Sequence, residues 1–239
     1  MKRIRLFAAL LMAALVVTSC ITWVDDEGNL GNSSITVINA KVENGEDYRS
    51  RCGGGSYNST IKFVKALLID DETVVATGTY SNGGFTIELP STVDEQYLFP
   101  ISLFADDHDD EDIIKNDIKF SNPNVKACNA YIYGFDKSDA AIYDCSTDFY
   151  YDTKPPGWRG SKDDRFYTGG VIIYVNGDVS ITGSLINDWS DDEHYNIFLK
   201  KGWNIMYWDS ECIYDGNTFR KEIFHITNHA PNNMKWWAN

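Results

Sequence analysis

The chain has 239 residues, 43% hydrophobic and 23% charged, so it can bury a sizeable core and is not expected to be disordered. It carries 35 acidic and 21 basic residues, a formal net charge of −14. This balance excludes nucleic acid as an expected partner, because phosphate binding depends on clustered positive charge. Aromatic residues reach 14%, with 14 Tyr and 7 Trp, which favours strands and recognition surfaces.

The N-terminus has the pattern of a lipoprotein signal peptide. Three basic residues precede the apolar stretch 6–17, which is too short to span a bilayer because a spanning helix takes about 20 residues. The stretch ends in Val17-Thr18-Ser19-Cys20, which resembles the bacterial lipobox. We therefore expect a signal peptide over 1–19 and lipidation of Cys20. The alternative is an ordinary signal peptide followed by a chance cysteine.

A polar segment, 20–33, follows the expected anchor and contains Asp25-Asp26-Glu27. It resembles the acidic export tether of surface lipoproteins of the Bacteroidetes group. This resemblance implies an outer-membrane protein held to the membrane by its lipid, with the cell surface as its location. A solvated linker in a periplasm-facing lipoprotein is the alternative.

Four further cysteines agree with an extracytoplasmic protein and are disulfide candidates: Cys52, Cys128, Cys145 and Cys212. Four cysteines allow three pairings, and the sequence does not choose among them. A Cys128–Cys145 bridge would close a short loop and contribute about 3 kcal/mol by the loop-entropy model. A Cys52–Cys212 bridge would then join the two ends of the mature chain. Buried thiols are the alternative.

The body of the chain is expected to be strands and turns, with a β-sandwich domain over 34–150. In 85–89 the apolar side chains alternate with Thr86 and Glu88, which is typical of a half-buried strand. The odd positions of 61–69 are apolar except at Lys65. Further strands are expected over 35–42, 73–80, 97–104 and 125–135, with Ser81-Asn82-Gly83-Gly84 as a turn.

A Pro/Gly-rich loop or linker is expected over 151–165, and 166–239 forms a second β-rich domain or continues the sandwich. Asn176-Gly177 predicts a type I′ hairpin between two strands. The expected strands here are 171–175, 178–182, 195–199 and 203–208, followed by one or two final strands over 212–227. The strands 195–199 and 203–208 are expected to pair as a hairpin. No segment after the signal peptide has a helical apolar period. The prediction is an all-β, antiparallel β-sandwich, with two packed β-domains as the alternative.

The first half resembles the transthyretin-like, carboxypeptidase-regulatory type of β-sandwich. The resemblance lies in the apolar strand 61–69, Val74-Val75-Ala76-Thr77-Gly78, and the Gly-Phe hairpin with its Leu-Pro exit, Gly83 to Pro90. The insertion 51–56 departs from that pattern. In the second half, segments 174–183, 199–204 and 231–237 resemble lipoproteins of the Bacteroidales. The resemblance implies the sandwich fold and no established activity.

One acidic run is a candidate cation site. Six carboxylates lie within 106–112, and a hard divalent cation with oxygen ligands would relieve their repulsion. Asp106, Asp110 and Asp117 are spaced as in a calcium loop, but Glu111 stands where the loop needs glycine. A solvated acidic loop is the alternative, so no cofactor is expected and Ca²⁺ is the only candidate.

Motifs of catalysis are absent from the sequence: no nucleophile elbow, phosphate loop or His-Glu-x-x-His zinc motif is present. Glu222 and His225 are three residues apart and would face opposite sides of a sheet. We therefore expect no enzymatic activity. A lipid-anchored glycoside hydrolase is one alternative, because that reaction needs only two spaced carboxylates.

Tryptophans in expected loops are the candidate binding residues: Trp158, Trp189 and Trp237. Exposed Trp rings stack on sugars or anchor protein interfaces. Trp203 and Trp208 are expected to fill the sandwich and, five residues apart, to point to opposite faces. The predicted function is binding of a polysaccharide or a surface protein by an envelope lipoprotein. A structural, fimbrial-type surface lipoprotein is the second alternative.

Overall fold

The structure, a computed structural model, describes the following residues: 35–43, 51–52, 55–56, 63–68, 73–105, 113–136, 138, 147–152, 166–187, 191–216 and 218–238. These residues contain strands, turns and two short 3-10 helices, η1 (Glu95–Tyr97) and η2 (Ile101–Ala105), so the all-β prediction is confirmed. The predicted signal peptide, 1–19, and tether, 20–33, lie outside the described residues. Within the described part no helix has the length and apolar character to cross a membrane.

Seventeen strands are described. The first ten are β1 (Val37–Lys41), β2 (Arg51–Cys52), β3 (Gly55–Ser56), β4 (Phe63–Leu68), β5 (Val74–Ser81), β6 (Gly84–Glu88), β7 (Phe99–Pro100), β8 (Ile113–Asn116), β9 (Lys119–Phe120) and β10 (Lys126–Phe135). The others are β11 (Thr147–Asp152), β12 (Phe166–Val175), β13 (Val179–Asn187), β14 (Asp191–Leu199), β15 (Gly202–Asp215), β16 (Thr218–Thr227) and β17 (Lys235–Ala238).

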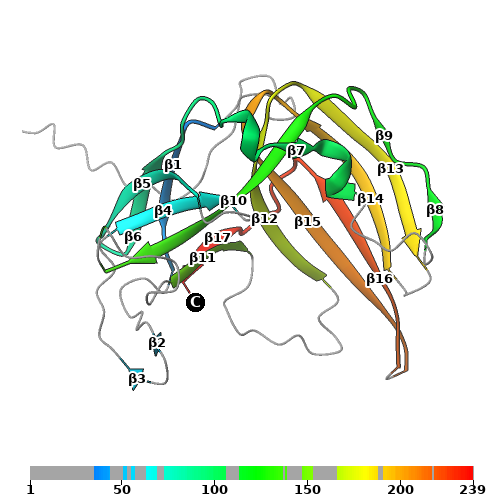
Figure 1. Cartoon of the computed structure of the whole chain (residues 1–239). Helices are drawn as coiled ribbons and strands as arrows, with labels where there is room; N and C mark the ends of the chain where they lie inside the picture. Colours follow the sequence, from blue (N-terminus) through cyan, green and yellow to red (C-terminus); the bar gives the residue numbers. More distant parts are fainter. Residues whose placement is uncertain are drawn as a thin grey trace, which may run out of the picture.

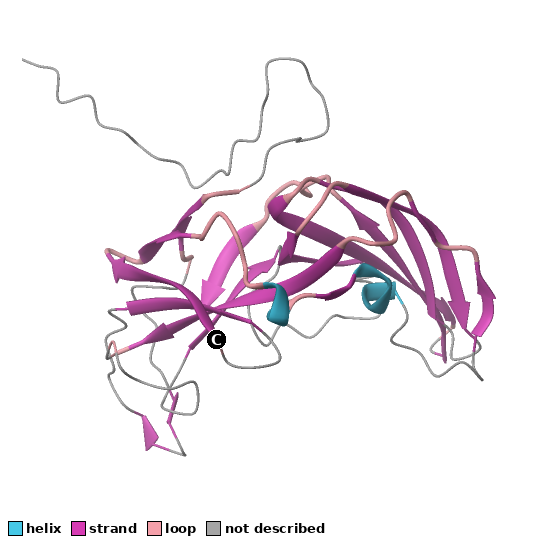
Figure 2. Ribbon diagram, turned by 45° about the horizontal axis from the view of Figure 1, so that its top comes forward, coloured by secondary structure: helices cyan, strands magenta, loops and turns pink. Residues whose placement is uncertain are grey.

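Fifteen of these strands form one sheet, in the order β1-β6-β5-β4-β10-β11-β12-β15-β16-β14-β13-β8. Strand β17 pairs with β11, β7 and β12 with β10, and β9 with β13, while β2 and β3 pair only with each other. Figure 1 shows β1, β4, β5 and β6 at one end of the molecule and β8, β13, β14 and β16 at the other. Seen from another side, the sheet is bent into an arch (Figure 2).

The middle strands of the arch carry a hydrophobic core on each face. On β12, Ile172 and Tyr174 belong to the first core, whereas Ile173 and Val175 belong to the second. Side chains of a strand alternate between faces, so one strand serves both cores. The first core also contains Ile38, Val64, Phe85, Trp203 and Trp236, and the second contains Ile101, Val179, Ile181, Ile197 and Leu199. The sheet therefore runs without a break through the predicted segments 34–150 and 166–239.

The β5–β6 hairpin follows the sequence prediction. Asn82 and Gly83 both have positive φ, 53° and 73°, which a tight hairpin turn requires of its two central residues. In β6, Phe85 and Ile87 are buried and Thr86 and Glu88 exposed, as the alternating pattern predicts. On β4 the outcome is different. The even positions enter the first core and the odd-numbered Leu67 is also buried, so the strand is covered on both faces at Leu67, while Phe63 at its start is half-buried.

Both hairpins predicted for the second half are wrong. Strands β12 and β13 do not pair, and neither Asn176 nor Gly177 has the positive φ of a type I′ turn. Instead, Asn176 hydrogen-bonds Lys126 through both its side chain and its backbone N–H, which ties the end of β12 to β10. Strands β14 and β15 are separated by β16, which runs parallel to β14 and antiparallel to β15.

One more predicted strand is wrong, and the structure contains strands that the sequence did not predict. The segment 97–104 is not one strand: β7 has two residues and is flanked by η1 and η2, because Pro100 has no N–H to continue a ladder. The strand β17 was not predicted at all. It pairs with β11 and places Trp236, 4% exposed, in the first core.

Candidate functional site

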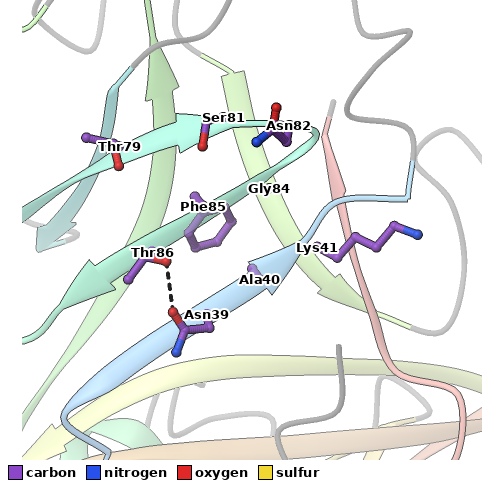
Figure 3. A pocket seen from close by; sticks show the side chains of 9 residues that line it. All are labelled: Asn39, Ala40, Lys41, Thr79, Ser81, Asn82, Gly84, Phe85 and Thr86. Carbon is purple, nitrogen blue, oxygen red and sulfur yellow. Dashed lines mark hydrogen bonds between the residues drawn. The ribbon is translucent and has the colours of Figure 1, made fainter. Parts of the chain in front are cut away.

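A groove of about 480 Å³ opens on the outer face of β1, β5 and β6. Its lining comes from three neighbouring strands and one turn: Asn39, Ala40, Lys41, Thr79, Ser81, Asn82, Gly84, Phe85 and Thr86 (Figure 3). Among the lining residues, alternation turns Ala40 and Phe85 inward and leaves the hydroxyls of Thr79, Ser81 and Thr86 and the amide of Asn39 outside. The groove therefore presents a polar, hydrogen-bonding surface opposite the first core.

Gly84 explains why this face is hollowed. It lies between Lys41 on β1 and Ser81 on β5, which are its partners in the sheet. A Cβ atom at this position would lie only 2.3 Å from the carbonyl oxygen of Ala40, so no side chain fits here. The backbone itself forms this part of the groove.

Asn39 and Thr86 form a hydrogen-bonded pair in the groove. They are directly opposite on β1 and β6, and the Thr86 hydroxyl donates to Asn39 Oδ1 at 2.8 Å (Figure 3). The bond fixes the orientation of the amide. It leaves the Asn39 NH₂ as a donor and the Thr86 oxygen as an acceptor, side by side on the exposed face.

Among the described residues, the groove is lined by one charged side chain, Lys41, and by no carboxylate, histidine or cysteine. General acid–base chemistry and metal binding both need such groups, so the lining offers hydrogen bonds and little else. Within the described part of the chain, no group of three His, Cys, Asp or Glu residues is placed to hold a metal ion.

A second hollow, of about 330 Å³, adjoins the groove and shares Thr79 with it. Its other lining residues are Phe63, Lys65, Thr77, Gly78 and Ser138. The ammonium of Lys65 lies 4.5 Å from the centre of the Phe135 ring, which is a cation–π distance. This lysine is 8% exposed, so its charge faces an aromatic ring more than solvent.

The predicted tryptophan site is only partly described. Trp158 and Trp189 lie outside the described residues. Trp237 is half-buried on β17, and its indole N–H donates to the carbonyl of Asp152 at 3.2 Å. Trp203 and Trp208 do point to opposite faces, Trp203 into the first core and Trp208 against the second, as predicted.

Of the three predicted calcium ligands, only Asp117 is described; Asp106 and Asp110 lie outside the described residues. Asp117 Oδ1 accepts from the N–H and hydroxyl of Ser184 at 2.6 and 3.0 Å, and Oδ2 lies 2.7 Å from the Lys115 ammonium. The hydrogen bond from Lys115 and those from Ser184 hold the pKa of Asp117 well below its ordinary value of 3.8. A calcium ion would have to displace Lys115 from this carboxylate.

Asp117→Asn is expected to make the free energy of unfolding less dependent on pH in acid. Because the folded-state pKa is lowered, the carboxylate stabilises the fold fully above 3.8 and loses that contribution as pH falls toward the lowered value. The free energy of unfolding, measured with urea between about pH 5 and pH 2, should therefore fall less steeply in the variant. Glu88→Gln, which removes one exposed carboxylate elsewhere, is the control for net charge. Equal slopes for Asp117→Asn and wild type would contradict the prediction.

The sheet register excludes one of the three disulfide pairings. Cys128 lies opposite Tyr174, which lies opposite Trp203, nine residues before Cys212 on β15. That separation is about 30 Å along the strand, against about 7 Å for bridged Cα atoms. Cys128 and Cys212 therefore do not pair with each other. Cys145 and the side chain of Cys52 lie outside the description, so the other two pairings stay predictions.

The predicted placement of Glu222 and His225 on opposite faces is confirmed by their positions in β16. His225 instead stacks on His194 of the parallel strand β14, with ring centres 5.5 Å apart. No carboxylate–histidine pair for catalysis is formed by Glu222 and His225.

Sequence reasoning missed the groove. Its outward-facing residues lie at polar positions of three predicted strands and of the turn between two of them, a pattern that by itself indicates only solvent exposure. The usable signal was compositional: the outward positions Asn39, Thr79, Ser81 and Thr86 are all uncharged, in a chain with 35 acidic residues. Their alignment depends on register, which the sequence did not specify.

Comparison with known proteins finds nothing similar: no family model, no curated protein and no solved structure matches the chain. The resemblances to transthyretin-like sandwiches and to Bacteroidales lipoproteins therefore stay predictions.

Proposed function

We propose that the chain is a lipid-anchored protein of the outer membrane, exposed at the cell surface, that binds a glycan and catalyses no reaction. The signal-peptide and lipobox pattern ending at Cys20 supports the location. The observation that carries the binding function is the uncharged donor–acceptor pair of Asn39 and Thr86 in an open groove.

A sugar hydroxyl both donates and accepts hydrogen bonds, and two neighbouring hydroxyls on a ring do so side by side. The Asn39 amide and the Thr86 oxygen offer a matching donor and acceptor on adjacent strands. Thr79 and Ser81 add two hydroxyls on the next strand. Because the Asn39–Thr86 bond already orients the amide, little ordering cost is left for binding.

The choice of binding over catalysis rests on the same lining. Glycoside hydrolysis takes two carboxylates on either side of the scissile bond, and the described lining of the groove has none. The contact surface proposed here also differs from the predicted loop tryptophans, because Trp237 is half-buried and hydrogen-bonded.

The test is retention of the full chain, purified in detergent, on an array of bacterial, plant and host polysaccharides. We expect retention on at least one polysaccharide. Thr86→Val, which removes the hydroxyl and keeps the shape, should weaken that retention about three- to tenfold, as for the loss of one net hydrogen bond. Thr182→Val, an exposed threonine on β13, is the matched control and should leave retention unchanged. No retention on any polysaccharide would refute the proposal.

A further inference from the structure

The groove is one end of a longer row of side chains that crosses four strands. Asn39 lies opposite Thr86, Thr86 opposite Thr79, and Thr79 opposite Phe63. Directly opposite residues of antiparallel strands share a face, so all four side chains are on the outer surface of β1, β6, β5 and β4. Three strand spacings of about 4.8 Å give this row a length of about 14 Å.

The two hollows lie along this row and meet at Thr79, which lines both. The first supplies the Asn39–Thr86 pair, and the second supplies the hydroxyl of Thr77 and the half-buried ring of Phe63. An aromatic ring can pack against the apolar face of a sugar, while hydroxyls bind its edge. The strip formed by both hollows is longer than one sugar ring.

The two cations of the strip are not placed to select an acidic ligand. Among the described residues, the charged side chains that line it are Lys41 and Lys65. The Lys41 side chain extends away from the other groove side chains (Figure 3), and the Lys65 ammonium lies over the Phe135 ring. Neither cation is placed as a partner for a sugar acid, and the net charge of −14 repels a polyanion at long range.

We propose that this strip binds an internal stretch of a neutral polysaccharide, laid across the strands from Asn39 to Phe63. The inference rests on the proposed glycan binding and adds the charge, the orientation and the length of the ligand. Because the contacts are spread over two hollows, a single sugar fills only part of the strip. Affinity should then rise with chain length until both hollows are occupied, and the ends of the chain should not matter.

The experiment is calorimetric titration of the full chain in detergent with neutral oligosaccharides of one to six sugars. They are prepared from whichever neutral glucan or mannan the array retains, and polygalacturonate serves as the acidic probe. We expect affinity to increase at least about tenfold from the monosaccharide to the tetrasaccharide and then to level off. Reduction of the terminal sugar to its alditol should leave the hexasaccharide affinity unchanged.

Variants at the two ends of the strip locate the ligand. Thr86→Val, in the first hollow, should weaken the short and long oligosaccharides alike. Thr77→Val, an exposed position in the second hollow, should weaken the tetrasaccharide about three- to tenfold and the disaccharide less. Thr182→Val remains the control. Both test variants keep the strand shape, so circular dichroism should be unchanged.

Three results would overturn this inference. Equal affinity for monosaccharide and hexasaccharide, with Thr86→Val still impaired, would leave glycan binding intact and remove the extended strip. Stronger binding of polygalacturonate than of neutral chains would remove the charge assignment alone. No binding of any saccharide would overturn the inference together with the proposed function.

Discussion

Trp203→Ala is expected to lower the free energy of unfolding by about 3–5 kcal/mol, the usual cost of deleting a buried large aromatic side chain. Trp203 is 1% exposed in the first core and packs edge-on against Tyr174 with ring centres 5.3 Å apart. Its indole N–H donates to the carbonyl of Pro90 at 2.8 Å, and its own carbonyl accepts from Ile35 at 2.7 Å. Trp203 therefore links β15 to the segments that precede β1 and follow β6.

Urea denaturation followed by circular dichroism measures this loss. Trp203→Phe is the matched variant: it keeps an aromatic ring in the core and loses the bond to Pro90, so it should cost less than Trp203→Ala. A loss below about 1 kcal/mol for Trp203→Ala, typical of surface positions, would contradict the central packing position of this side chain.

Gly78→Ala is expected to be strongly destabilising although it adds a single methyl group. The new Cβ would lie 2.1 Å from the carbonyl oxygen of Thr86 on the neighbouring strand, and backbone cannot move aside as a flexible side chain can. Strands β5 and β6 would have to separate, which we expect to cost about 1–3 kcal/mol or more. Because Thr86 lines the groove, glycan retention should fall as well.

The matched control for this substitution is Gly177→Ala. Its Cβ would meet only the side-chain methyl of Val125, at 3.2 Å, and Gly177 has no positive φ to lose. Melting temperature and retention on the array are measured for both variants. Equal melting temperatures for Gly78→Ala and Gly177→Ala would contradict the prediction that β5 and β6 leave no space for a Cβ atom at position 78.

The β5–β6 hairpin shows which features of the fold could be predicted from the sequence. The alternation of Phe85 and Ile87 with Thr86 and Glu88 predicts a half-buried strand, and Asn82-Gly83 predicts its turn; both are confirmed. These are local signals, because side-chain alternation and turn φ angles depend on residues next to one another. The five-residue spacing of Trp203 and Trp208 likewise predicted their opposite faces.

The hairpins predicted for the second half are not formed, because strand pairing depends on residues that are far apart in the sequence. The Asn176-Gly177 pair favours a type I′ turn, but the chain there hydrogen-bonds to Lys126 on β10, fifty residues away. Strand β16 lies between β14 and β15, and it packs Ile226 and Phe224 against the second core. Long-range contacts of this kind outweigh the turn preference of two residues.

By itself, the sequence determined the all-β class, the positions of several strands and, on β6, the inward or outward direction of the side chains, because these follow from short-range periodicity. Only the tertiary structure decided which strands are neighbours. The row from Asn39 through Thr86 and Thr79 to Phe63 joins residues up to 47 positions apart, and they meet because the register of three strand pairs places them opposite one another. Register is set by how whole strands pack on the core, so a surface built across strands cannot be found from any one segment.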